Sequence, residues 1–169
     1  WGQPVDPARI REALRANPGA RAVGFVHAET STGVRSDAQA IAAECREHGC
    51  LVIVDAVTSL AGIPLEIDGW GIDAVYSGSQ KCLSCTPGLS PVSFSPRAMA
   101  RIKARRHPAQ SWFLDLSLVA GDWQGQNGCR GGRTHHHTAP EFSILTKLPQ
   151  VCEPKIRGNN RLFFGQLCA

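Results

Sequence analysis

Three segments of the chain carry apolar residues at helical spacing and begin with residues that favour helix starts. In each, a short polar side chain can accept a hydrogen bond from a free N–H of the first turn; these caps are Asp6, Ser36 and Ser95. Pro7 and Pro96 suit a first helical turn, and Gln39 makes a plausible capping box with Ser36. The pattern predicts helices near residues 6–16, 36–48 and 95–106.

Four short apolar runs predict strands, at residues 22–27, 51–54, 72–76 and 89–94. The run at 51–54 is continuously apolar, as in a central strand of a parallel sheet. Strand, helix and strand follow one another, which predicts a right-handed βαβ unit. Because Pro91 cannot donate to a strand ladder, we expect the fourth strand near a sheet edge. The fold class expected is α/β, with a mostly parallel sheet and flanking helices.

The pattern is lost towards the end of the chain. Glycine, histidine and irregular residues replace it from Gly125, and no clear helical or strand period follows Pro140. We therefore expect a partial α/β domain over residues 1–140 and an atypical, irregular tail over 141–169. Two interpretations of the tail stay open, namely disorder and a shifted reading frame.

Composition narrows the class of protein. Apolar residues make up 43% of the 169 residues and charged residues 19%, which is typical of a folded domain. The net charge of +4 is mild, and the one dense basic run, residues 101–107, is interpreted as a solvated helix face, so we expect no nucleic-acid partner. No apolar stretch is long enough to cross a bilayer and no signal peptide is visible, so we expect no membrane partner.

The cysteines and the first residue bear on where the protein works. Seven cysteines are scattered without a regular framework, which favours a reducing compartment. We expect the cytoplasm, or the peroxisome if the source is eukaryotic. The chain starts at Trp1, not Met, so we expect the natural start to be missing.

Polar residues follow three of the predicted strands: residues 27–33 after the first, Asp55 after the second, and residues 77–81 after the third. Because ligands gather at the carboxyl ends of parallel strands, these groups are expected at one edge of the sheet. Taken singly, Asp55 fits an ordinary strand end, Lys81 a solvated loop residue, and Ser77-Gly78-Ser79 a turn. Together they suit a pyridine cofactor with an aldehyde and a phosphate. The lysine amine can attack the aldehyde, the carboxylate can keep the ring nitrogen protonated, and hydroxyls and glycines can bind the phosphate.

Three motifs in this order resemble the class V, fold-type I aminotransferases, in particular the alanine–glyoxylate and serine–pyruvate aminotransferase group. They are His-Ala-Glu-Thr-Ser-Thr-Gly-Val (27–34), Val-Asp-Ala-Val-Thr-Ser-Leu-Ala-Gly (54–62) and Tyr-Ser-Gly-Ser-Gln-Lys-Cys-Leu (76–83). The resemblance runs from about residue 1 to Pro140. It implies the large cofactor-binding domain of a pyridoxal 5'-phosphate (PLP) enzyme.

The resemblance assigns roles to individual residues. Lys81 would form the Schiff base with PLP and then carry the proton between substrate and cofactor. Asp55 would pair with the pyridine nitrogen, and Thr30 would contact the ring oxygen or its surroundings. Ser79 and Gln80 would help to hold the phosphate.

The His136-His137-Thr138 run resembles a family motif that reaches the phosphate site of a neighbouring subunit, with Thr138 as the contact. The resemblance thus implies a homodimer. The family has a phosphate-binding Tyr where this chain has His135. The resemblance therefore implies that the imidazole of His135 would donate to the phosphate in place of the Tyr hydroxyl.

The implied reaction is ping-pong transamination between an amino acid, alanine or serine-like, and a 2-oxo acid such as glyoxylate or pyruvate. The family's Gly-rich phosphate loop, ring-stacking aromatic residue and carboxylate-binding arginine are absent from the sequence. We therefore interpret the chain as a fragment and expect it to be weakly active or inactive alone.

Other functions stay open on the sequence. Within the same fold, a cysteine desulfurase is the nearest enzyme alternative. Cys82-Leu83-Ser84-Cys85 has the spacing of a redox or zinc site, and His135, His136 and His137 could bind a metal. A non-catalytic fragment that dimerises is a further alternative.

Overall fold

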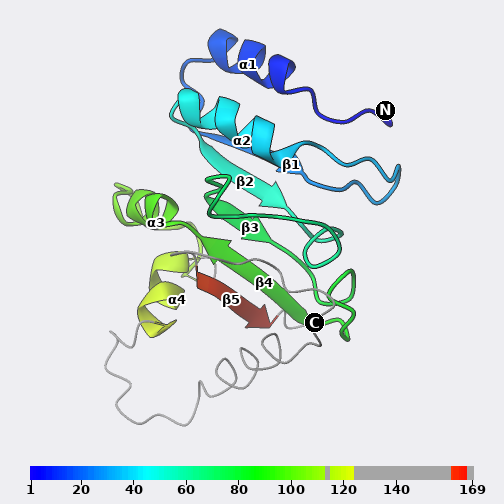
Figure 1. Ribbon diagram of the computed structural model, residues 1–169. Helices are drawn as coiled ribbons and strands as arrows, with labels where there is room; N and C mark the ends of the chain where they lie inside the picture. The colour runs from blue at the N-terminus through cyan, green and yellow to red at the C-terminus, as the bar shows by residue number, and fades with distance from the viewer. Residues whose placement is uncertain (113–114, 124–160, 167–169) are drawn as a thin grey trace.

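The computed structural model describes residues 1–112, 115–123 and 161–166, and these residues contain one mixed five-stranded sheet. The strands lie in the order β1 (Ala22–Val26), β2 (Leu51–Asp55), β3 (Ala74–Tyr76), β4 (Leu89–Phe94) and β5 (Arg161–Gln166). The helices are α1 (Pro7–Ala16), α2 (Ala38–Glu47), α3 (Pro96–Lys103) and α4 (Leu116–Trp123). Figure 1 shows α1 and α2 beside the β1 and β2 end of the sheet, and α3 and α4 near β4 and β5.

The α/β fold class and the βαβ unit are confirmed. β1, β2 and β3 run parallel, whereas β4 is antiparallel to β3 and β5 is antiparallel to β4. The sheet is thus mixed, with its parallel part confined to the three strands that carry the polar groups at their ends. No helix among the described residues is long and apolar enough to cross a membrane.

The tail contains one regular element that the sequence pattern did not predict. β5 lies inside the segment 141–169, in which the sequence pattern predicted no element. Its backbone pairs along the whole of β4, from Leu89 to Phe94. Such long-range pairing leaves no mark in local periodicity, which explains why the pattern did not reveal it. α4 was not predicted either.

β4 lies next to the edge strand β5 of the described sheet, so the expected place near an edge is confirmed. The Pro91 carbonyl accepts a hydrogen bond from the Ser77 N–H at 2.9 Å, one residue beyond the end of β3. Pro91 therefore faces a residue beyond β3, and its missing N–H removes no hydrogen bond from the β3 ladder. This explains how an inner strand accommodates a proline.

Two of the three expected helix caps are confirmed. Asp6 accepts from the Ala8 N–H at 2.9 Å, and Ser95 accepts from the Ala98 N–H at 3.0 Å. The cap of α2 is Asp37, which accepts from the Ala40 N–H at 3.0 Å, so the capping box from Ser36 is wrong. Ser36 is buried, and its hydroxyl accepts from a backbone N–H in the segment before α1.

The core lies on one face of the parallel strands, where α2 packs against β2. Alternate strand residues supply it, and the buried ones include Phe25, Val52, Val54 and Val75. The residues between them face the other way. That opposite face is more open: Asp55 is half-buried, Val26 is 37% exposed and Tyr76 is 43% exposed.

Candidate active site

The three parallel strands end level with one another. Val26 pairs with Asp55, and Asp55 pairs with Tyr76, so the last residues of β1, β2 and β3 form one row. The ladder continues one step further, because the His27 N–H donates to the Asp55 carbonyl at 3.0 Å. The expected meeting of three strand-end segments is thus present in the structure.

Asp55 is held by two hydrogen bonds on the open face of the sheet. Its Oδ1 accepts from the Val57 N–H at 2.9 Å, and its Oδ2 accepts from the Tyr76 hydroxyl at 2.8 Å. The same hydrogen bond raises the pKa of the Tyr76 phenol, with smaller contributions from burial and the carboxylate charge. The orientation of the carboxylate is therefore set by the chain's own hydrogen bonds.

Sequence reasoning missed Tyr76 as a site residue. The available signal was its position at the end of the third apolar run, next to a strand that ends in Asp55. In a parallel pair the ends of neighbouring strands meet, so a polar group there was a candidate partner for the carboxylate.

Thr58 joins the three strand-end segments. Its hydroxyl donates to the Ala28 carbonyl in the segment after β1. Its own carbonyl accepts a hydrogen bond from the Cys82 thiol at 3.2 Å, in the segment after β3. Thr58 itself follows Asp55, so a continuous set of contacts spans the predicted site.

Lys81 lies on an exposed turn after β3. The Ser84 N–H closes the turn onto the Lys81 carbonyl at 2.9 Å, and Ser84 adopts a positive φ of 55°. Gln80 is also exposed. Gly78 makes room for it, since a Cβ on Gly78 would come within 2.8 Å of the Gln80 Oε1. Amine and amide are both accessible to a ligand.

Ser79 differs from its neighbours because it is buried. Its hydroxyl donates to the Thr86 carbonyl at 2.6 Å and accepts from the Leu89 N–H at 3.4 Å. In this conformation the hydroxyl supports the loop. Of the two predicted phosphate contacts after β3, Gln80 is the accessible one.

Thr30 lies exposed on a tight loop after β1. The Gly33 N–H donates to the Glu29 carbonyl at 2.8 Å, and Gly33 has a φ of 70°, which favours glycine. The Glu29 carboxylate accepts from the N–H and the hydroxyl of Ser31, both at 2.9 Å, and these bonds lower its pKa. The loop that presents Thr30 is therefore well fixed.

His27 opens the first motif but lies on the core face, away from Asp55. It is 2% exposed and meets the Trp70 ring edge-on, with the ring centroids 6.3 Å apart. Burial lowers its pKa, and the charge of Arg35 adds to this effect. His27 is thus a neutral core residue that supports the strand end.

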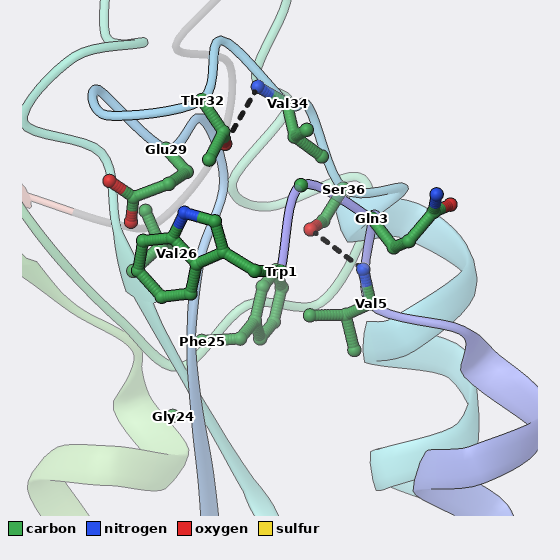
Figure 2. A pocket seen from close by; sticks show the side chains of 11 residues that line it. Trp1, Gln3, Val5, Gly24, Phe25, Val26, Glu29, Thr32, Val34 and Ser36 are labelled. Carbon is green, nitrogen blue, oxygen red and sulfur yellow. Dashed lines mark hydrogen bonds between the residues drawn. The ribbon is translucent and has the colours of Figure 1, made fainter.

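A cavity of about 310 Å³ lies beside β1 and the N-terminal segment. Figure 2 shows it between Trp1, the open side of β1 and the loop that carries Glu29 and Thr32. Its lining residues are Trp1, Gly2, Gln3, Val5, Gly24, Phe25, Val26, Glu29, Thr32, Val34 and Ser36. Asp55, Gln80 and Lys81 are not among them, so this cavity and the predicted site are separate.

The donor set at the strand ends fits PLP. A fixed carboxylate, an exposed amine and an exposed amide match the ring nitrogen, aldehyde and phosphate of that cofactor. Among the described residues, no cluster of three or more His, Cys, Asp or Glu side chains could hold a metal ion. His135, Thr138 and the run of three histidines lie outside the described residues, as does the domain boundary at residue 140.

Comparison with known proteins places the chain in a family. The model of the aminotransferase class-V family matches residues 2–107, which is more than half of the chain. The chain belongs to the class-V aminotransferase family, so the resemblance noted from its motifs is confirmed. The family implies dependence on PLP.

Individual relatives match about seven tenths of this chain. The chain is 43% identical over 122 residues to alanine–glyoxylate aminotransferase of Oryctolagus cuniculus, covering 72% of this chain and 30% of the relative. It is 46% identical over 119 residues to the soluble hydrogenase 42 kDa subunit of Anabaena cylindrica, covering 69% of this chain and 30% of that protein.

Solved structures give the same result. Alanine–glyoxylate aminotransferase from Nostoc sp. matches with a TM-score of 0.69 and 42% identity over 73% of this chain and 32% of that one. Ureidoglycine–glyoxylate aminotransferase from Bacillus subtilis matches with the same TM-score and 38% identity over the same shares. These matches do not favour the cysteine desulfurase alternative. The chain spans about 30% of the length of the relatives it matches.

Proposed function

We propose that the protein represented by this chain is a PLP-dependent aminotransferase that exchanges an amino group between an amino acid and a 2-oxo acid. The observation that carries the proposal is the level row of strand ends, at which the Tyr76–Asp55 pair and the segment leading to Lys81 lie together. PLP, when bound, supplies an aldehyde for amine exchange and a cationic ring that withdraws electrons. The residues described below supply binding, orientation and proton transfer.

Asp55 would keep the cofactor's ring nitrogen protonated when PLP is bound. An anionic carboxylate next to that nitrogen favours its protonated form. The Val57 N–H and the Tyr76 hydroxyl fix both carboxylate oxygens, so little reorganisation is needed when the ring arrives. Tyr76 acts as a positioning residue for Asp55.

Lys81 attaches the cofactor and moves the substrate proton. Its exposed amine is a nucleophile towards an aldehyde once it is deprotonated. With PLP bound and the amino substrate in place, the freed Lys81 amine would hold the proton of the substrate's α-carbon and return it. The closed turn after Lys81 limits where this amine can reach.

The phosphate is assigned to Gln80 and Ser79, with Thr30 beside the ring. The exposed Gln80 amide can donate directly. Ser79 orders the loop from within in this conformation, and its hydroxyl would have to leave the Thr86 carbonyl to donate to a phosphate. Thr138, with His135 beside it, is proposed to complete the phosphate site of a second subunit, which makes a homodimer part of the proposal.

We propose glyoxylate or pyruvate as the amino acceptor and alanine or a serine-like amino acid as the donor. The relatives that support this are named alanine–glyoxylate and ureidoglycine–glyoxylate aminotransferases, and they share glyoxylate. The described cysteines Cys45, Cys50, Cys82 and Cys85 are free thiols, which agrees with a reducing compartment such as the cytoplasm or peroxisome.

The test is covalent trapping of the cofactor. The purified chain is incubated with PLP, reduced with borohydride, digested and analysed by mass spectrometry. We expect the pyridoxyl group on Lys81, together with loss of the cofactor's yellow absorbance band. Lys81→Ala should abolish the trapping, whereas Lys103→Ala, which removes an exposed lysine of α3, should not. Label spread equally over several lysines would refute the assignment.

Activity is a separate question for this chain. Orientation of bound substrate contributes on the order of 7–11 kcal/mol in well-oriented reactions. The resemblance assigns no residue of these 169 to ring stacking or to binding of the substrate carboxylate, so we expect trapping at Lys81 with little or no turnover of alanine and glyoxylate. Robust turnover by the 169-residue chain would contradict this expectation.

A further inference from the structure

The Cys82 thiol is one of the contacts that hold the Lys81 turn in place. Its S–H donates to the Thr58 carbonyl at 3.2 Å, and the Thr58 hydroxyl in turn donates to Ala28. The thiol lies close against Gly62, because a Cβ on that glycine would come within 2.6 Å of the Cys82 Sγ. The position of Cys82 therefore depends on a small, protonated sulfur.

A second thiol lies on the same turn. Cys85 is exposed, as is Cys82, and its own N–H donates to the Ser79 carbonyl at 2.9 Å. Ser84 lies between them with a φ of 55°, so the chain reverses direction there. The Cys-x-x-Cys spacing is the one that small redox-active disulfides use. The two thiols thus share a short, bent and accessible segment.

The other described cysteines provide an internal contrast. Cys45 and Cys50 are buried in the core, and burial raises the pKa of the Cys45 thiol to about 11. Neither is accessible to a bulky oxidant. Among these four cysteines, an oxidant in solution can therefore react only with the exposed thiols of Cys82 and Cys85.

We propose that Cys82 and Cys85 form a thiol–disulfide switch that a small-molecule disulfide of the glutathione type closes, and that its closure displaces Lys81. The consequence for cofactor binding rests on the proposed function, whereas the disulfide and the displacement of Lys81 do not. In the first step the Cys82 sulfur attacks the disulfide, forming a mixed disulfide and releasing one thiol. In the second step Cys85 attacks the Cys82 sulfur, the internal disulfide forms, and a second thiol leaves. Two protein thiols are oxidised and one disulfide molecule is reduced to two thiols.

The displacement follows from the loss of the S–H group. A disulfide sulfur has no hydrogen and cannot donate to Thr58, so the contact between the Lys81 turn and the segment after β2 is lost. The Cys82 sulfur also lies close against Gly62, so this contact changes if the disulfide moves the sulfur. Lys81 directly precedes Cys82, so its backbone moves with it.

The first measurement tests the disulfide without any cofactor. The chain is equilibrated in glutathione buffers from reducing to oxidising, blocked with an alkylating reagent and digested with trypsin. Cleavage after Lys81 and Arg97 places both cysteines in one peptide, residues 82–97. We expect the oxidised peptide to escape alkylation and to have the mass of the free dithiol peptide less two hydrogens, and Cys85→Ser to carry bound glutathione at Cys82 instead. Cys82 bonded only to glutathione in the unaltered chain, or to Cys129, Cys152 or Cys168, would overturn the proposal.

The second measurement tests the position of Lys81, again without cofactor. The rate at which an amine-selective acylating reagent labels Lys81 is compared between the reduced and oxidised chain, with Lys103 as internal reference. We expect a severalfold change at Lys81 and none at Lys103. Cys82→Ala, which removes the S–H donor without oxidation, should give the same change. Equal labelling of Lys81 in all three forms would overturn the switch.

The third measurement separates the switch from the proposed function. Borohydride trapping of PLP at Lys81 is measured in the reduced and oxidised chain. A severalfold drop on oxidation, reversed by dithiothreitol, supports both proposals. Absence of trapping in the reduced chain refutes the cofactor proposal, while the switch is still judged by the disulfide and the labelling rate. Equal trapping in both forms refutes the switch and leaves the cofactor proposal standing.

Discussion

The hydrogen bond from Tyr76 to Asp55 gives a prediction that can be read from a single chromophore. Tyr76 is the one tyrosine in the chain, so the absorbance of ionised tyrosine reports on this residue alone. The neutral phenol donates to Asp55, and an ionised phenolate would face the carboxylate charge without that bond. The pKa of Tyr76 is therefore raised, first by the hydrogen bond and then by burial and the charge.

Asp55→Asn should lower the pKa of Tyr76 towards its ordinary value. The amide oxygen can still accept a hydrogen bond, but it carries no charge. Alkaline titration followed by tyrosinate absorbance measures the change. Asp6→Asn is the matched control, because Asp6 caps α1 and asparagine can cap in its place. Identical titration curves for the unaltered chain and Asp55→Asn would refute the proposed pair.

Tyr76→Phe measures the energy of the same bond. Hydrogen bonds to charged groups contribute about 1.5–3 kcal/mol when buried, but Tyr76 is 43% exposed, so we expect a loss of about 1 kcal/mol in the free energy of unfolding. Because the pKa of Tyr76 is raised in the folded state, its hydrogen bond stabilises the fold fully at pH values below the unfolded-state pKa of about 10. The difference in the free energy of unfolding between the unaltered chain and Tyr76→Phe should therefore be largest at neutral pH. It should vanish as the pH rises through the folded-state pKa of Tyr76. Urea unfolding at several pH values checks the sign.

Three further predictions follow from other contacts. Asp73 is 2% exposed and accepts from Arg97, Ser95 and the Val52 N–H. The Arg97 side chain is 39% exposed, so its loss should cost less than the about 3–5 kcal/mol typical of a fully buried pair. Arg97→Ala leaves the buried Asp73 carboxylate without its cation and should therefore be less stable to urea than Arg101→Ala, which changes an exposed residue of the same helix; equal losses would contradict this. Gly62→Ala should push Cys82 away and reduce borohydride trapping at Lys81, whereas Gly19→Ala, with open space around it, should leave trapping unchanged. The hydrogen bond from Arg11 lowers the pKa of Glu44, so the pair stabilises α1 on α2 above the unfolded pKa of about 4.3 and this stabilisation is lost as pH falls through the folded pKa. Thermal unfolding of Arg11→Ala should accordingly show a weaker dependence on acid than the unaltered chain.

Much of the fold could be predicted because the signals are local. Asp6 and Ser95 cap helices where the polar-then-apolar pattern begins, and the continuous apolar run of β2 marks a buried central strand. The α2 cap shows the limit of such reasoning. Ser36 and Asp37 are both good caps, and only the segment before α1, which uses the Ser36 hydroxyl, leaves the role to Asp37.

Some residues of the candidate site could likewise be predicted from the sequence, whereas others could not. Asp55, Thr30 and the segment up to Lys81 could be proposed from residue type and from their place after apolar runs. Tyr76 as a partner of Asp55, Thr58 as the joint between segments and the inward turn of the Ser79 hydroxyl could not. Each depends on the register between strands or on which face a side chain occupies.

By itself, the order of residues determined where the helices α1 to α3 and the strands β1 to β4 form, which strands end in polar groups, and which chemistry those groups suit. Only the tertiary structure decided that β5 completes the sheet, that His27 belongs to the core and Asp55 to the open face, and that Cys82 lies against Gly62. The physical reason is range. Capping and periodicity act within a few residues, whereas strand pairing and close packing join residues far apart in the chain and are set by the free energy of the whole fold.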